Sequence, residues 1–248
     1  MLPDFQDVHV WFVELSTGNA VVEQCSRNLS ADERQRASRF QFEHLRSAFT
    51  VSRSILRLLL ARYLQVEPTD IRFSYGVRGK PQLAWPAVPF AFNLAHSGRL
   101  AAYAFAIGCE VGIDLEEIRS IPEQQSLVRS FFSREEFRDW MDLKPRQRNE
   151  AFFLGWTRKE AYIKAVGDGL SLPLDSFQMS LRPDEPARLI REGNDHASAT
   201  RWAIFSFAPV EGYVGALALP ELNRSLRVLP LLTAEAVLTL TSSDTFPP

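Results

Sequence analysis

The chain has 248 residues, of which 46% are hydrophobic and 23% charged, a balance typical of a globular protein and not of a fibrous or disordered one. Its two cysteines, Cys25 and Cys109, exclude a disulfide framework. The formal net charge is −2, yet residues 27–80 hold eleven Lys or Arg and five Asp or Glu, so that stretch carries +6 and the remainder −8. A basic stretch of this kind indicates either a solvated helix face or a site for a small polyanion. Nucleic acid is disfavoured because the clustering is modest.

The first residues have no basic start and no apolar core, which argues against a signal peptide. No uncharged, proline-free run reaches the roughly 18 residues that a membrane span needs. We therefore expect a cytoplasmic protein that does not enter a membrane.

The first half of the chain predicts a mixture of helices and strands. Ser30 and Glu33 form a capping-box sequence that begins one helix, and a second helix follows at 44–64. His96 to Arg99 is predicted to be the turn of an apolar hairpin. The predicted strands lie at 8–15, 71–75, 90–95, 100–106 and 111–116.

The second half predicts helices first and strands afterwards. The helices are expected at 123–132, 133–141 and 148–166, and the last of them ends at Gly167. Strands are expected at 177–181, 202–207 and 213–219. Residues from 223 onward show no clear pattern.

The order helix, strand, apolar hairpin occurs at 44–106 and again at 148–219. This weak repeat in element order predicts an α+β fold of two similar halves with a ligand cleft between them. We expect an N-terminal half at 1–109, a C-terminal half at 110–220 and a tail at 221–248.

Asp114 and Glu116 are two apart on a predicted strand, so both carboxylates point to one face while Ile113 and Leu115 point to the other. Mg²⁺ takes one or two carboxylates together with substrate phosphates, so the pair suits this metal. A solvated strand face explains the same pattern.

Glu160 and Lys164 stand at i and i+4 on the long predicted helix, the spacing of an ordinary surface ion pair. Alternatively, Glu160 supplies a third metal oxygen and Lys164 contacts a phosphate. Spacing alone does not choose between these interpretations.

His96 lies beside a small residue that allows a ligand to approach the backbone, although a lone turn histidine is more often structural or merely solvated. Lys80 follows Gly79, but Ser74 and Pro81 stand where a P-loop needs Gly and Ser or Thr. Zinc-ligand spacing, a G-x-S-x-G elbow and a dinucleotide G-x-G-x-x-G motif are absent from the sequence.

Taken together and in order, these motifs resemble the 4′-phosphopantetheinyl transferase superfamily, in particular its Sfp-type members, which are pseudodimers in one chain. The resemblance runs from about residue 30 to 219, and it rests most specifically on G-I-D-L-E and W-T-R-K-E-A-Y-I-K. The matching segments are 71–73, 79–81, 92–98, 111–116, 131–133 with Glu136, 156–164 and 169–175.

The resemblance implies a role for each matching residue. Asp114, Glu116 and Glu160 are similar to the family's Mg²⁺ ligands, and Lys164 to the residue that contacts the pyrophosphate. Lys80 and His96 correspond to residues that hold phosphates of coenzyme A, while Glu136 matches a glutamate implicated in activating the acceptor hydroxyl. The basic stretch that binds the nucleotide 3′-phosphate in the family would here include Arg36, Arg39 and Arg53.

The implied function is transfer of 4′-phosphopantetheine from coenzyme A to a serine of an apo acyl or peptidyl carrier protein, with release of 3′,5′-ADP. Either Glu160 or Glu136, acting through water, would take the serine proton. We expect a monomer whose partners are coenzyme A, Mg²⁺ and the carrier. The alternatives are a Mg²⁺-dependent nuclease or phosphodiesterase and a non-catalytic coenzyme A-binding protein.

Overall fold

The computed structural model describes residues 7–240 apart from 77–78, 168–171, 194 and 221–222. Residues 1–4, on which the expectation about a signal peptide rests, lie outside the described part. So do residues 77–78 of the loop at 76–81 and residues 169–171 of the family-like loop at 169–175.

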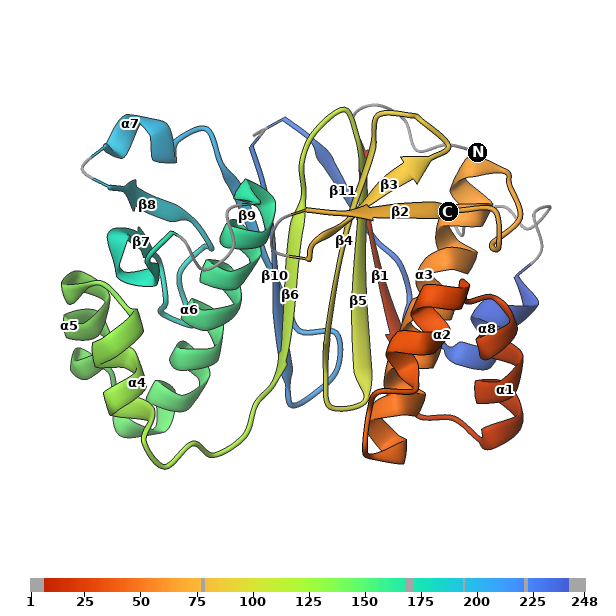
Figure 1. Cartoon of the computed structure of the whole chain (residues 1–248). Helices are drawn as coiled ribbons and strands as arrows, with labels where there is room; N and C mark the ends of the chain where they lie inside the picture. Colours follow the sequence, from red (N-terminus) through yellow and green to blue (C-terminus); the bar gives the residue numbers. More distant parts are fainter. Residues whose placement is uncertain (1–6, 77–78, 168–171, 194, 221–222, 241–248) are drawn as a thin grey trace.

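The N-terminal half begins with a strand, continues with three helices and ends with two hairpins (Figure 1). Its elements are β1 (Asp7–Glu14), α1 (Asn19–Arg27), α2 (Ala31–Ala37), α3 (Glu43–Leu64), β2 (Arg72–Tyr75), β3 (Pro81–Trp85), β4 (Phe90–Ser97) and β5 (Leu100–Ile107).

The C-terminal half repeats this plan. Its elements are β6 (Gly112–Glu117), α4 (Gln124–Phe131), α5 (Arg134–Asp142), α6 (Pro145–Val166), a 3₁₀ turn (Leu174–Ser176), β7 (Phe177–Met179), β8 (Leu189–Glu192), α7 (His196–Ala199), β9 (Ala203–Phe207) and β10 (Tyr213–Leu219). Three further elements close the chain: β11 (Ser225–Val228), β12 (Leu232–Thr233) and α8 (Ala234–Thr239).

The molecule is built in four layers, helix, sheet, sheet, helix (Figure 1). The sheet β11-β1-β5-β4 is covered by α3, and the sheet β6-β10-β9 is covered by α6. Between the two sheets lies an apolar core to which both halves contribute. Because β1 is buried on both faces, its sequence is almost continuously hydrophobic: Val10 and Phe12 face the other sheet, whereas Trp11 and Val13 face α3.

The prediction of two similar α+β halves is confirmed. The long helices α3 and α6 both have 22 residues. In each half the first strand pairs antiparallel with the last strand of a hairpin, β1 with β5 and β6 with β10. Edge strand β4 meets β6, where the Ile113 N–H donates to Asn93 Oδ1 at 2.9 Å.

The tail, to which the sequence assigned no role, adds to the N-terminal half. β11 and β12 pair parallel with β1, and α8 packs onto α3 through Ala234 and Val237. Pairing across more than 200 residues leaves no local signal in so short a segment. Helices α1 and α7 and strands β3 and β8 were also not predicted.

Two predicted boundaries need correction. His96 belongs to β4, where it stands opposite Ala101, and the turn is confined to Gly98 and Arg99. The tightness follows from Gly98, whose φ of 52° is one that glycine tolerates. The strand expected at 177–181 stops at Met179. Within the described residues no helix is long and apolar enough to cross a membrane.

Candidate functional site

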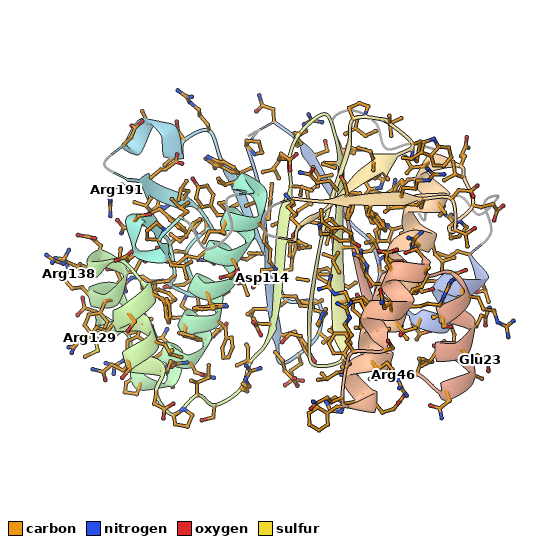
Figure 2. The ribbon with its side chains drawn as sticks, in the orientation of Figure 1. Glu23, Arg46, Asp114, Arg129, Arg138 and Arg191 are labelled. Carbon is orange, nitrogen blue, oxygen red and sulfur yellow. The ribbon has the colours of Figure 1, made fainter. Side chains whose placement is uncertain are left out.

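Strand β6 turns two acids towards helix α6. Asp114 and Glu116 share that face, while Ile113 and Leu115 pack in the core between the sheets. Gly112 lies on the same face, where a Cβ atom would come within 2.1 Å of the Ala161 carbonyl oxygen. Glycine therefore lets the strand lie directly against the helix, and Asp114 sits between the two elements (Figure 2).

Asp114 is 7% exposed and is held by a lysine of α6. Lys164 Nζ lies 2.7 Å from Asp114 Oδ1 and also donates to the Ile113 carbonyl at 3.1 Å. The other oxygen, Oδ2, is buried and has no hydrogen-bond partner among the described residues. A buried, unsatisfied carboxylate oxygen is costly in free energy, so it indicates a place for a ligand.

Three carboxylates, those of Asp114, Glu116 and Glu160, lie close enough to influence one another's pKa values. Burial raises the pKa of Asp114. The charge of Lys164 lowers this pKa, and the charge of Glu160 raises it further. Burial also raises the pKa of Glu116, against a hydrogen bond from Ser97 and with a contribution from Asp114. Burial is also the main cause of the raised pKa of Glu160. The charge of Lys164 opposes this rise, and the charge of Glu116 adds to it. Each of the three carboxylates is therefore repelled by the negative charge of another, and a bound cation would relieve this repulsion.

The donor chemistry fits Mg²⁺, because all three groups are carboxylates and one oxygen is orphaned. Within the described residues no group of three acidic, His or Cys side chains is already gathered to hold an ion. Lys164 instead pairs with Asp114, so the interpretation of Glu160 and Lys164 as a simple surface ion pair is not what the structure has.

Next to these acids lies a cleft of about 340 Å³ that both halves line. It brings together five of the predicted phosphate-binding residues: Arg36, Arg53, Lys80, His96 and Lys164. Arg39 lies apart, in an adjoining hollow of about 590 Å³ that shares Arg36 and Tyr75 with the cleft. The sequence predicted this basic lining but not the aromatic residues Phe49 and Tyr75, which carry no motif of their own.

Lys80 and His96 reach the cleft from the N-terminal half. Lys80 Nζ donates to the Lys164 carbonyl at 2.7 Å and lies 3.1 Å from Glu110 Oε2, so it ties the two halves together. Burial lowers the pKa of His96, and the nearby charge of Lys164 lowers it further. A neutral imidazole at pH 7 both donates and accepts hydrogen bonds.

Ser97 was missed by the sequence reasoning although it follows His96. Its hydroxyl donates to Glu116 Oε2 at 2.8 Å and accepts from the Glu117 N–H at 3.1 Å. Its side chain therefore fixes one of the acids from across the seam between β4 and β6. The signal in the sequence was the polar residue ending an otherwise apolar strand.

Glu136 is not brought to the cleft. Its side chain is fully buried, and its oxygens accept hydrogen bonds from the Ser133 and Met179 N–H groups at 2.6 and 2.7 Å. Lys159 Nζ, equally buried, lies 2.8 Å from Glu136 Oε2. These contacts indicate a structural role for Glu136, so of the two predicted candidates for the base, Glu160 and Glu136, only Glu160 belongs to the group of acids next to the cleft.

Two family models match the chain. The model described as the 4′-phosphopantetheinyl transferase superfamily covers residues 110–218. The model described as 4′-phosphopantetheinyl transferase, N-terminal, covers residues 18–107.

Curated relatives agree with these models. The 4′-phosphopantetheinyl transferase HetI of Nostoc sp. is 37% identical over 86% of this chain and 87% of its own length. The 4′-phosphopantetheinyl transferase Sfp of Bacillus subtilis is 34% identical over 63% of this chain and 68% of its own. Among solved structures, the holo-[acyl-carrier-protein] synthase of Thermotoga maritima is 22% identical, with a TM-score of 0.37 over 45% of this chain and 62% of its own.

Proposed function

Because the chain belongs to the 4′-phosphopantetheinyl transferase superfamily, we propose how its cleft performs the transfer. The enzyme moves 4′-phosphopantetheine from coenzyme A to a serine of an apo carrier protein. The observation that carries the assignment to this cleft is the orphaned Asp114 oxygen beside Lys164, at the edge of a basic hollow lined by both halves.

The basic residues divide the work of binding coenzyme A. Arg36, Arg39 and Arg53 hold the 3′-phosphate, for which the guanidinium fork is well suited because it makes paired hydrogen bonds to phosphate. Lys80, His96 and Lys164, which lie nearer the carboxylates, hold the pyrophosphate. The outer hollow and the neighbourhood of the acids thus offer separate places for the two anionic groups of the ligand.

Asp114, Glu116 and Glu160 are the residues that would hold Mg²⁺, which would neutralise charge on the pyrophosphate. The protein contributes the orientation of these acids. Ser97 fixes Glu116, and Lys164 holds Asp114 while no cation is bound. When a cation takes the place of Lys164 beside Asp114, the Lys164 ammonium group is able to turn to a phosphate oxygen.

In the reaction, the serine Oγ of the carrier bonds to the β-phosphorus of coenzyme A. The bond from that phosphorus to the bridging oxygen breaks, and its electron pair leaves with 3′,5′-ADP. The serine proton passes to a carboxylate, and we assign this role to Glu160 because Glu136, the other candidate, is buried in a pair with Lys159. Lys164 supplies a fixed positive charge, and His96 supplies a hydrogen bond, to the phosphate oxygens.

The test is incubation of the purified protein with coenzyme A, Mg²⁺ and an apo carrier protein, followed by mass spectrometry of the carrier. We expect a mass gain of one phosphopantetheine group on one serine. Binding of coenzyme A without any gain would indicate the non-catalytic alternative. Cleavage of nucleic acid without a gain would indicate the nuclease.

Since each half supplies part of the cleft, we propose that a single chain suffices for activity. Sedimentation of the active enzyme tests this proposal.

A further inference from the structure

The same buried device occurs once in each half. A short helix begins with a capping box whose glutamate also pairs with a cation on the following long helix. The two sets are Ser30, Glu33 and Arg57 in the N-terminal half, and Ser133, Glu136 and Lys159 in the C-terminal half. The carboxylate–cation distances are 2.6 Å for Arg57 and 2.8 Å for Lys159.

The N-terminal set has one additional member. Arg53 Nε lies 3.0 Å from Glu33 Oε1, so one carboxylate holds two guanidinium groups. Their side chains are only 7% and 2% exposed. The set therefore carries a net charge of +1, whereas Glu136 and Lys159 balance. A buried charge is expensive unless a counter-charge comes close.

The second arginine takes the place that a backbone group has in the other half. Glu136 Oε1 accepts from the Met179 N–H at 2.7 Å, whereas Glu33 Oε1 lies 3.0 Å from Arg53 Nε. Arg57 binds the other oxygen of Glu33 and also donates to the Pro68 and Ile71 carbonyls at 2.7 and 3.0 Å. Arg53 differs from Arg57 because it lines the cleft. Its charge therefore faces the place where an anion binds.

Arg53 is held on several sides. Glu33 fixes Nε, Tyr75 Oη accepts from Nη2 at 2.9 Å, and the guanidinium carbon lies 4.9 Å from the centre of the Phe73 ring. Nη1 makes no hydrogen bond to the described residues. A guanidinium fixed in this way loses little conformational entropy on binding a phosphate.

We propose that Glu33 is a positioning residue that, together with Tyr75, aims Arg53 at a phosphate group of coenzyme A. The proposal rests on the proposed function, because it assumes that the cleft binds coenzyme A. Glu33 is 1% exposed and lines the outer hollow beside Arg36 and Arg39, and as an anion it acts on the phosphate through Arg53. Its counterpart Glu136 pairs with one cation, the buried Lys159, and has no such effect on binding.

The test compares Glu33→Gln with its matched control Glu136→Gln. Glutamine preserves the capping box in both helices but removes the charge that holds the cations. For Glu33→Gln we expect the KM for coenzyme A and its calorimetric Kd to rise about 10-fold, while kcat stays within about 3-fold, as for lost binding that is equal in ground and transition states. Glu136→Gln lowers the melting temperature but leaves the Kd for coenzyme A unchanged.

A double-mutant cycle separates positioning from general damage. In an Arg53→Gln background, Glu33→Gln should change the Kd by less than about 2-fold, since there is no arginine left to aim. Glu33→Asp, which keeps the charge, should restore part of the affinity. If Glu33→Gln does not fold, Tyr75→Phe takes its place, because Tyr75 is 42% exposed and its substitution should be tolerated. We expect Tyr75→Phe to raise the Kd for coenzyme A about 3-fold.

An unchanged Kd in Glu33→Gln or Tyr75→Phe, or equal losses in Glu33→Gln and Glu136→Gln, would overturn the proposal. Failure of the proposed function gives a different pattern, since the wild type would then not modify the carrier, whether or not it bound coenzyme A.

Discussion

The two halves of this molecule share a frame but use the strand–helix contact differently. In the N-terminal half, β1 meets α3 through His9 and Trp11, which are both 2.8 Å from Tyr63 Oη in a buried aromatic cluster. In the C-terminal half, β6 meets α6 through Asp114 and Lys164. The first contact is called the sealed contact here, because its polar groups are hydrogen-bonded to one another within an apolar cluster. The second contact is charged and includes a carboxylate oxygen without a hydrogen-bond partner among the described residues.

If the proposed site is correct, this difference explains how a repeated fold carries a single reaction centre. Two copies of a sealed contact would bind nothing, and two copies of a charged contact would double the cost of buried charge. Of the residues proposed for the site, the N-terminal half contributes most of the cations, while the C-terminal half contributes the carboxylates and Lys164. Substitutions in the buried carboxylate–cation pair alter a feature that both halves have. Substitutions in the charged contact, the cleft arginines and His9 alter features that only one half has.

The largest expected effect comes from breaking the buried pair of the C-terminal half. Lys159→Met leaves Glu136 uncompensated in the core, which should lower the free energy of unfolding by about 3–5 kcal/mol. Urea denaturation measures the change. The double variant with Glu136→Gln should recover much of the loss, because no unpaired charge remains. A lysine that merely fills space would give the double variant a loss at least as large as that of the single variant.

The next effect concerns the charged contact alone. Asp114→Ala or Glu160→Ala should reduce kcat by about two to three orders of magnitude, the cost typical of losing one strong transition-state electrostatic group. The fold should persist, since removing one of three mutually repelling acids relieves strain when no cation is bound. Carrier modification and thermal melting measure the two quantities. Glu117→Ala, an exposed neighbour on β6, is the control, and near wild-type transfer by both site variants at saturating Mg²⁺ would remove these acids from the site.

A smaller effect is expected at the cations of the N-terminal half. Arg36→Ala should lower kcat/KM for coenzyme A by about 10- to 150-fold, the worth of a charge-assisted hydrogen bond, and leave 3′-dephospho-coenzyme A almost unaffected. Arg36 lines both hollows and stacks on Phe49 at 5.4 Å, whereas Arg39 lines only the outer one, so Arg39→Ala should cost less. Arg46→Ala, an exposed residue paired with Glu43, is the control. Equal losses for both cofactors would place these arginines elsewhere than at the 3′-phosphate.

The sequence predicted the long helices, the central strands and their repetition, because each is marked by local periodicity or by a cap. It also placed Asp114 and Glu116 on one face, since period two requires it. It could not show that Lys164 pairs with Asp114 and not with Glu160, or that Glu136 pairs with Lys159, because these contacts depend on how α6 packs on other elements. The role of residues 225–239 was hidden for the same reason, as their strands pair with the first strand of the chain.

An effect on stability alone is expected at His9, the histidine of the sealed contact. His9 is 3% exposed, and burial lowers its pKa from 6.5 to about 4, helped by the charge of Arg227. Between these two values the unfolded chain binds a proton that the folded chain does not. Stability is therefore fully present above pH 6.5 and is lost as the pH falls towards 4. At about 1.4 kcal/mol per pH unit, lowering the pH from 7 to about 4.5 should remove about 2–3 kcal/mol.

Urea unfolding at the two pH values measures this loss, and His9→Gln should remove most of it. His44→Gln, at an exposed position on α3, should keep the whole of the loss and serves as the control. The comparison of the halves makes the test specific, because the described strand β6 has carboxylates where β1 has this histidine. If His9→Gln loses as much stability on acidification as the wild type does, the pH dependence arises from other groups, and the aromatic contact between β1 and α3 is not what acid disrupts.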